Sequence, residues 1–310
     1  MQLPALRSSF LLAALLAGSL AGCGGAPVAT RSVPLARHLA GSWMDPSAKT
    51  KPLLYLSDES GLVYVYAYPS LAPMGTLAGM TTPAGLCTDR KGDVWVTDTI
   101  RSQVVEFAHG GTVPIRTLQD GEGYLYACAV NPRNGDLAIA NNTIGGDDAG
   151  NVTIFSHGFG KATAYSDRHV RFVDFLGYDP RGDLLVDGYA AYRRSPWLDE
   201  LAAGGKKLKH IAWHGPRINH PGGVQWDGSS WAIGTTSGVI YQTANGAVKG
   251  KTTLEDACYA DQFFIDGSRV IASSLCNSVG VFHIYKYPDG GAPLKTIAGF
   301  TYPYGAVISR

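Results

Sequence analysis

The chain has 310 residues, with 26 lysines and arginines against 25 aspartates and glutamates, which gives a formal net charge of +1. This balance offers no electrostatic reason to expect nucleic acid or a strongly acidic partner. Charged residues make up only 16% of the chain, whereas glycines number 39. Low charge with abundant glycine, tyrosine and β-branched residues is typical of a β-rich globular domain with many tight turns.

The first 22 residues have the pattern of an export signal. Arg7 supplies a positive charge, and Phe10 to Leu16 form an apolar core that is too short to span a bilayer. The segment Leu20-Ala21-Gly22-Cys23 follows. It resembles the lipobox of bacterial lipoproteins, in which the signal is cut before a cysteine whose thiol is then acylated. The alternative is an ordinary signal peptide followed by an incidental cysteine.

This resemblance implies that Cys23 carries a lipid anchor and that the mature chain belongs to a bacterial cell envelope. Several acyl chains together give stable anchoring, because each buried methylene contributes ~0.8 kcal/mol. Gly24, rather than an aspartate, follows the cysteine. By the rule for Gram-negative lipoproteins, this implies the outer membrane, with the folded domain in the periplasm or at the cell surface.

The segment after Cys23 is rich in alanine, proline, serine and glycine and has no periodicity, which is typical of a linker. We therefore predict a signal peptide over residues 1–22, a flexible tether over 23–51 and a folded domain over 52–310.

Within residues 52–310 a turn followed by an apolar strand recurs. Clear copies are Asp89-Arg-Lys-Gly-Asp93, Asn131-Pro-Arg-Asn-Gly-Asp136 and Asp179-Pro-Arg-Gly-Asp183, and weaker copies begin at Asp227 and Asp266. Glycine beside aspartate or asparagine between β-rich runs favours a hairpin, because the turn needs a positive φ. Asp93 and Asp136 lie 43 residues apart, and Asp136 and Asp183 lie 47 apart. This period, with about four strands per unit, predicts a β-propeller.

The repeats predict six blades. Their inner strands are expected to begin near Gly85, Ala127, Phe175, Gly223, Gln262 and Gly305. The first apolar runs, 53–56 and 62–68, have no inner strand before them, so the C-terminal run 305–309 is expected to complete the N-terminal blade. Such a closure removes an open sheet edge. Residues 196–203 could form a short helix, but their match to the other repeats predicts a strand.

The segment Gly85-Leu-Cys-Thr-Asp-Arg-Lys-Gly-Asp-Val-Trp-Val-Thr-Asp98 resembles an NHL-type propeller repeat. The usual form of that repeat is Gly-Leu-Ala-Val-Asp, two or three turn residues, and a strand that ends in aspartate. The resemblance covers residues 52–310 and departs from the pattern at Thr235 and Ser273, where the strand-ending aspartate is lost. The family contains binding modules and scattered enzymes, so the fold alone does not define an activity.

An exported chain permits disulfides, and four cysteines follow Cys23. Cys258 and Cys276 flank the predicted turn at 266–269. A three-residue loop that pairs Ile265 with Arg269 would set these two cysteines opposite each other, within disulfide reach. We therefore expect this bridge, the alternative being two buried thiols.

Cys87 and Cys128 lie on the inner strands of neighbouring predicted blades, where a bridge between blades and two core thiols are equally compatible with the sequence. Their spacing suits no zinc site, and no Cys-x-x-Cys occurs. Neither Gly-x-Ser-x-Gly nor a phosphate-binding Gly-x4-Gly-Lys-Ser/Thr motif is present. We therefore predict no catalytic residue, no metal ligand and no cofactor.

The positions just before the inner strands should surround one mouth of the central channel. They are Ala84, Tyr126, Asp174, Gly222, Asp261 and Tyr304. The two tyrosines and two aspartates would make a small polar site with aromatic walls, suited to a sugar, a peptide or a cation, and Ala84 and Gly222 would leave space. We predict Tyr126, Asp174, Asp261 and Tyr304 as ligand-binding residues. The alternative is a set of ordinary loop residues around a solvent-filled channel.

The sequence favours a non-enzymatic propeller on the envelope that binds a protein, a peptide or a glycan through a loop-rich face. Its membrane contact would be Cys23 alone, without nucleic acid as a partner. The alternative is a metal-dependent lactonase or hydrolase. Resemblance to gluconolactonase-type propellers would then assign Asp174 and Asp261, with Asn141 or Asn142, to a divalent ion at the channel mouth. These residues come from three blades and lack that family's spaced ligand pattern.

Overall fold

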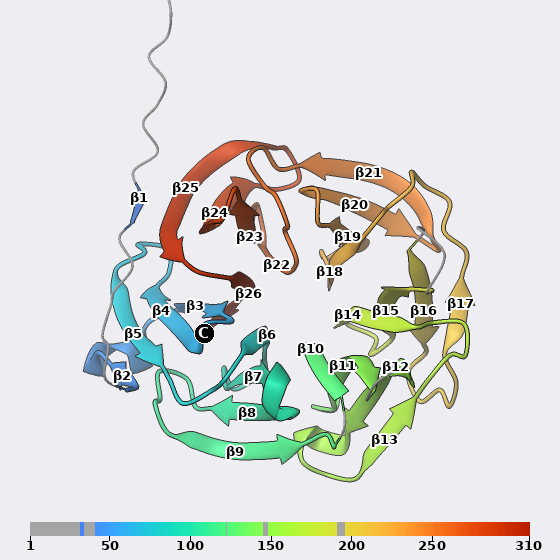
Figure 1. The fold of residues 1–310 in the computed structure, drawn as a ribbon, viewed down its shortest axis with the longest axis horizontal. Coiled ribbons are helices and arrows are strands. Elements are labelled where there is room, and N and C mark those ends of the chain that lie inside the picture. Colours follow the sequence, from blue (N-terminus) through green and yellow to red (C-terminus); the bar gives the residue numbers. More distant parts are fainter. Residues whose placement is uncertain (1–31, 34–40, 122, 145–147, 191–195) are drawn as a thin grey trace, which may run out of the picture.

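The computed structural model describes residues 32–33, 41–121, 123–144, 148–190 and 196–310. Within these ranges the chain forms six antiparallel sheets arranged in a ring around a central axis (Figure 1). The prediction of an all-β, six-bladed β-propeller is confirmed. The predicted lipidation residue, Cys23, lies outside the described residues. No helix in the described ranges is long and apolar enough to cross a membrane.

Blades two to five each contain four strands that run in sequence order from the axis outwards. Blade two contains β6 (Pro83–Thr88), β7 (Val94–Asp98), β8 (Gln103–Phe107) and β9 (Pro114–Gln119). Blade three contains β10 (Gly123–Val130), β11 (Leu137–Ile144), β12 (Asp148–Phe155) and β13 (Ala162–Tyr165). Blade four contains β14 (Phe172–Tyr178), β15 (Leu184–Tyr189), β16 (Trp197–Leu201) and β17 (Lys209–Ile211). Blade five contains β18 (Pro221–Trp226), β19 (Trp231–Thr235), β20 (Val239–Ala244) and β21 (Ala247–Thr253).

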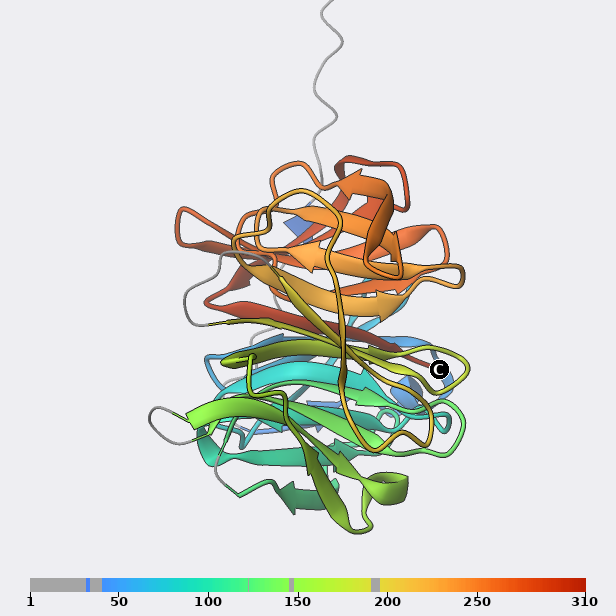
Figure 2. The ribbon, with the colours of Figure 1, turned by 90° about the vertical axis from the view of Figure 1, so that its right-hand side faces the viewer.

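Blades one and six carry a fifth strand at their outer edges. From the axis outwards, blade six contains β22 (Phe263–Asp266), β23 (Arg269–Cys276), β24 (Val279–Lys286), β25 (Gly290–Phe300) and β1 (Ser32–Val33). In the same order, blade one contains β26 (Pro303–Ser309), β3 (Leu53–Asp58), β4 (Leu62–Ala67), β5 (Pro73–Leu77) and β2 (Trp43–Met44). Figure 2 shows the ring edge-on, from the side on which blade four lies. The segment 196–203 contains the strand β16, as its repeat pattern predicts.

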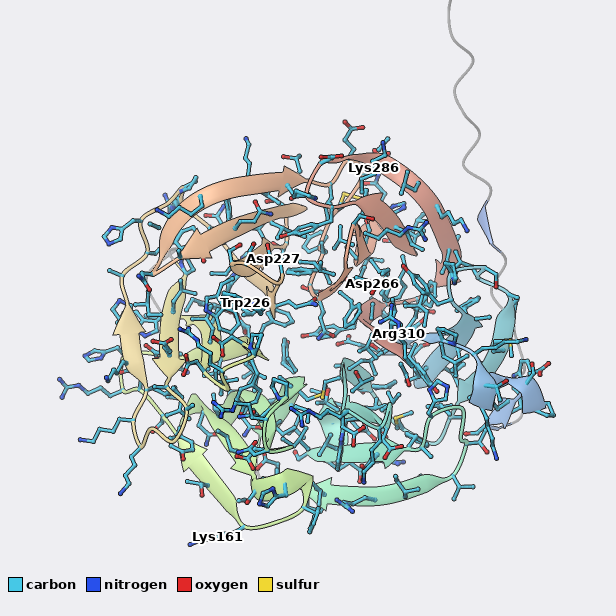
Figure 3. All side chains as sticks on the ribbon, turned by 180° about the vertical axis from the view of Figure 1, so that it is seen from behind. Lys161, Trp226, Asp227, Asp266, Lys286 and Arg310 are labelled. Atoms are coloured by element: carbon cyan, nitrogen blue, oxygen red, sulfur yellow. A yellow bond between two sulfur atoms is a disulfide. The ribbon has the colours of Figure 1, made fainter. Side chains whose placement is uncertain are left out.

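The C-terminal strand closes the ring. β26 pairs antiparallel with β3, with Ser309 opposite Leu53 and Ala306 opposite Leu56. All residues of both strands are buried, because neighbouring blades cover both faces of blade one. Beyond β26, the Arg310 guanidinium donates a 2.6 Å hydrogen bond to Asp266 of blade six (Figure 3). The predicted closure is therefore confirmed.

The folded part begins before residue 52, which corrects the predicted end of the tether. Trp43 on β2 pairs with Thr76 on β5. A short 3-10 helix follows (η1, Pro46–Thr50), in which Asp45 caps the first turn and Ala48 is fully buried. Residues 41–51 thus belong to blade one, and β1 pairs with β25. Sequence periodicity does not reveal segments of this kind, because two-residue strands are too short to display a repeat.

The recurrent aspartates shape the turns between the first two strands of a blade. Asp89 accepts hydrogen bonds from the backbone N–H groups of Lys91 and Asp93 through one carboxylate oxygen, and Asp179 does the same for Arg181 and Asp183. Aspartate side chains stabilise turns in this way by acting as substitute backbone acceptors. The repeated sequence unit therefore corresponds to a repeated hairpin.

Two disulfides join the four remaining cysteines. Cys258 and Cys276 form the expected bridge, with their Cα atoms 5.1 Å apart. The predicted register is wrong, however, because Ile265 pairs with Val270 across a two-residue turn, and Cys258 precedes β22 rather than facing Cys276 across the strands. Cys87 and Cys128 also form a disulfide, which joins the inner strands of blades two and three. The sequence had left open whether these two cysteines form a bridge or remain core thiols.

Candidate functional site

The structure brings the four predicted mouth residues, Tyr126, Asp174, Asp261 and Tyr304, together from four different blades. The rings of Tyr126 and Tyr304 meet edge to face with centroids 5.8 Å apart. Burial raises the pKa of Tyr126 to about 12, and the charges of Asp174 and Asp261 raise it further in the same direction. The prediction that these side chains converge at one mouth therefore agrees with their positions, while ligand binding stays a prediction.

Asp174 is held at the mouth by a hydrogen bond from blade three. Its side chain lies at the start of β14 in a residue that is only 7% exposed. The Asn142 side-chain amide donates to its Oδ1 atom. Burial raises the pKa of Asp174 to about 7, against the effect of this hydrogen bond, and the charge of Asp261 raises it as well.

Asp261 has a similar environment, to which Glu59 contributes, a residue that no sequence pattern indicated. Burial raises the pKa of Asp261 to about 7, and the charge of Glu59 raises it further. Glu59 lies in the turn between β3 and β4, where its backbone N–H donates to the carbonyl of Tyr302. Because this turn is more than 200 residues away from Asp261 along the chain, no local pattern could indicate the contact.

Asp187 on β15 is a second missed carboxyl. It is 1% exposed, its Oδ1 accepts from the backbone N–H of Phe175, and its Oδ2 finds no hydrogen-bond partner among the described residues. Burial raises its pKa well above the ordinary value, and the charge of Asp174 acts in the same direction. Burial therefore favours the protonated form of Asp187, in which one oxygen carries a donor hydrogen.

The strand register explains why Asp187 differs from the strand-ending aspartates of the repeat. Ser57 and Thr97 occupy its position in blades one and two, where their hydroxyls accept from Gly305 N and Gly85 N. Asp98, one residue later, accepts from the N–H groups of Thr81 and Thr82 and so holds the loop before the inner strand. Alignment of the repeats on Asp93 and Asp183 places Asp187 at the position of Thr97, and this signal in the sequence was overlooked.

The centre of the ring is filled, which corrects the expectation of a solvent-filled channel. Tyr304 stacks on Phe175 from the opposite blade with centroids 6.1 Å apart, and both residues are at most 5% exposed. The Tyr304 hydroxyl finds no hydrogen-bond partner among the described residues, and burial raises its pKa well above the ordinary value. A hydrogen-bond donor is thus buried at the floor of the mouth without an acceptor.

The small residues at the mouth do not leave free space, contrary to the prediction. Ala84 is 1% exposed, and a Cβ atom added at Gly222 would lie 2.9 Å from the carbonyl oxygen of Ala260. These positions accept small side chains because neighbouring backbone approaches them closely. The shape of the mouth is set instead by its tyrosines and carboxyls.

Aromatic side chains lie close to the mouth residues in the sequence, each two positions before the mouth residue of its blade. We call this set the aromatic rim; its members are Tyr124, Phe172, His220, Tyr259 and Tyr302. The three tyrosines are 49%, 67% and 55% exposed. Tyr189 stacks on Phe172 and meets His220 edge to face, which links the rim across blades four and five. Such a rim around a polar centre is typical of a recognition surface.

The two asparagines of the predicted alternative metal site have different partners. Asn142 is engaged with Asp174, and Asn141 donates instead to Asp120, Asn151 and Thr153. Within the described ranges, one group of three or more histidines, cysteines or acids has its ligand atoms within 4.8 Å of one another, and it consists of Asp89, Asp93 and Glu106 on blade two. This group lies outside the mouth.

A separate cavity of about 180 Å³ opens at the other end of the axis. It is bordered by the Cys87–Cys128 disulfide together with Tyr178, Trp226 and Gln262. Apolar and aromatic side chains dominate its walls, and no described acid lines it. The acidic mouth and this cavity are thus chemically different ends of the same propeller.

Six closed blades, a filled axis and a polar mouth with an aromatic rim place the chain in the class of β-propellers whose loops form a recognition face. The chain is 34% identical over 93 residues to NHL-repeat-containing protein 4 of Homo sapiens, an alignment that spans 28% of this chain and 73% of the relative. The chain therefore belongs to the NHL-repeat proteins, which generally act as binding or scaffold modules. No family model matches the chain.

Two solved structures share the fold. A chain of the nidogen/laminin complex superposes with a TM-score of 0.69 at 13% identity, covering 84% of this chain and 98% of its own length. A protein of unknown function from Bacteroides caccae superposes with a TM-score of 0.63 at 9% identity, covering 84% of this chain and 100% of its own. At these identities the likeness concerns the fold alone.

Proposed function

We propose that this NHL-repeat propeller is a non-enzymatic binding module that takes a basic side chain of a protein or peptide partner into its mouth. One observation carries the proposal. Asp174 and Asp261 lie at one mouth with Glu59 and Asp187 near them, and no described lysine, arginine or histidine contributes a favourable charge to either aspartate.

A cation is the group that such a site stabilises best. Buried carboxyls that repel one another have raised pKa values because their charged forms lack a counter-ion. An ammonium or guanidinium group from a partner would supply it, and the ring of Tyr126 would add cation–π attraction. Binding would then ionise Asp174 and Asp261 and release protons near neutral pH.

The rest of the face fits a polypeptide around that side chain. The exposed tyrosines of the aromatic rim supply large contact area with little loss of side-chain entropy.

The pattern of residues 1–23 supports a proposal for the location of the module. We propose that Cys23 is lipidated and holds the propeller at the bacterial envelope, in the outer membrane, with the domain in the periplasm or at the cell surface. The two disulfides support an exported chain, because such bonds persist in oxidising compartments.

Calorimetric titration of the purified protein with the tripeptide Ala-Lys-Ala, at about pH 8, tests the mouth. We expect binding that is lost in Asp261→Asn and kept in Asp289→Asn, a matched substitution on an exposed turn. The uncharged tripeptide acetyl-Ala-Gln-Ala-amide, which lacks a terminal ammonium group, should not bind. Binding of a neutral oligosaccharide in place of the lysine peptide would overturn the choice of partner. A stoichiometric divalent ion that is lost in Asp174→Ala would favour the metal-dependent enzyme instead.

A further inference from the structure

Blade two contains an acid cluster outside the mouth, formed by Asp89, Asp93 and Glu106. Asp89 and Asp93 bracket the turn between β6 and β7, and Glu106 reaches the turn from β8, where it lies opposite Trp95. Glu106 is 5% exposed and its Oε2 atom accepts no hydrogen bond from the described residues. The nearest basic atom, Nε of Arg116, lies 3.5 Å from Oε2 as an ion pair without a hydrogen bond.

Blade four shows what the same arrangement holds. Asp179, Asp183 and Glu200 occupy the equivalent positions, since Glu200 lies opposite Leu185 as Glu106 lies opposite Trp95. There the Arg181 guanidinium binds the turn acids, with Nε 2.8 Å from Asp179 and Nη2 3.1 Å from Asp183. The blade-four cluster is therefore a cation site whose cation belongs to the chain itself.

In blade two the residue at the position of Arg181 is Lys91, which forms no ion pair with the described acids. The Asp93 carboxylate also differs from its equivalents. Asp183 accepts from the backbone N–H of Ala203 and Asp136 accepts from that of His157, whereas Asp93 accepts no hydrogen bond from the described residues. Two of the three acids in blade two thus keep oxygen atoms that a ligand can use.

We propose that Asp89, Asp93 and Glu106 form a binding site for a divalent cation with a preference for oxygen ligands, such as Ca²⁺. Carboxylate oxygens within 4.8 Å of one another match the spacing around one such ion, and water would complete its coordination. The ion would take the place that the Arg181 guanidinium has in blade four, and it would neutralise the repulsion among the three carboxylates.

The position of this site gives the ion a structural role. Gly92, inside the same turn, accepts a hydrogen bond through its carbonyl from the Ser309 hydroxyl on β26. His109 also contacts Ser309 and, through its other ring nitrogen, the carbonyl of Lys51. The turn therefore supports the strand that closes the ring, and a bound cation would stiffen the closure.

Thermal unfolding of the full chain tests this site, with Ca²⁺ removed by a chelator or supplied as CaCl₂. We expect the midpoint to rise by roughly 5–10 °C when free Ca²⁺ is about 100 times Kd. Glu106→Gln should abolish the rise, and Glu200→Gln, its counterpart in blade four, should keep it. If Glu106→Gln fails to fold, Asp93→Asn takes its place.

A control at equal ionic strength with NaCl separates specific binding from screening. An unchanged midpoint in the wild-type protein, or an equal rise in Glu106→Gln, would overturn the site. Because the mouth residues are untouched by these substitutions, the result is independent of the lysine-peptide titration.

Discussion

The Gln262 side chain reaches past the inner strand of blade one and forms two hydrogen bonds with the backbone of Leu86. Its Oε1 accepts from Leu86 N at 3.3 Å, and its Nε2 donates to Leu86 O at 3.4 Å. Gln262 precedes the inner strand of blade six and Leu86 lies on that of blade two, so blade one and its C-terminal strand lie between them. Side chains near the axis of this propeller therefore hold together blades that are not neighbours.

We expect Gln262→Ala to destabilise the fold by about 1–3 kcal/mol, because Leu86 would keep a buried N–H and carbonyl without partners. Equilibrium unfolding in urea measures this change. Gln119→Ala is the matched control, since Gln119 is exposed and bonds only to Gln103 on an outer strand. A free-energy change of similar size in both variants would contradict the role of Gln262.

Removal of residues 303–310 should abolish cooperative unfolding rather than merely lower its midpoint, because β3 would lose its inner partner and blade one its closure. Removal of Arg310 alone is the control, since it costs only an exposed ion pair of about 0–1 kcal/mol. Calorimetry distinguishes the two. A sharp transition in the longer deletion would show that the remaining blades close without β26.

The stability of the protein should fall as the pH rises from about 4 to about 7. In this window Asp174 and Asp261 keep their protons in the folded chain, where their pKa values are raised from 3.8 to about 7, but lose them in the unfolded chain. Asp174→Asn should reduce this slope and stabilise the fold on the order of 2–4 kcal/mol at about pH 8. Urea unfolding across this pH range measures the effect, with Asp289→Asn as control; an unchanged slope in Asp174→Asn would contradict the assignment.

The two disulfides should respond differently to a mild reductant. Cys258 and Cys276 are partly exposed, whereas Cys87 and Cys128 are 7% and 3% exposed. Thiol attack requires access to a sulfur atom, so Cys258–Cys276 should open first. Mass spectrometry after alkylation identifies the opened pair. Replacing the buried pair by serines should cost about 4 kcal/mol, given the 41-residue separation it closes.

In the proposed cation site, Lys91→Arg should mimic blade four and remove Ca²⁺-dependent stabilisation without deleting any acid. The guanidinium would reach Asp89 and Asp93 as that of Arg181 reaches Asp179 and Asp183. Thermal unfolding with and without CaCl₂ measures the effect, and Lys249→Arg, on an outer strand of blade five, is the control. Undiminished stabilisation by Ca²⁺ in Lys91→Arg would contradict the comparison between the two blades.

The sequence predicted the number of blades, the closure and the four mouth residues because each depends on a repeat of fixed spacing. It did not place Glu59, which acts on Asp261 of the neighbouring blade six, or Asp187, which interacts with Asp174 across two strands of blade four. It also missed the turn that pairs Ile265 with Val270, because the segment Asp266-Gly-Ser-Arg269 is compatible with a loop of two residues or of three. Features that are local along the chain could be predicted from the sequence. Features that depend on strand register or on contacts between blades could not.

The packed axis also has a consequence for how the molecule can evolve. Since Phe175, Tyr304 and Gln262 form a partition, a molecule at the acidic mouth has no passage to the apolar cavity near Trp226. The two ends of the propeller axis are thus separate surfaces. Substitutions at one end leave the other end intact. The residues at the two ends can therefore change independently of each other.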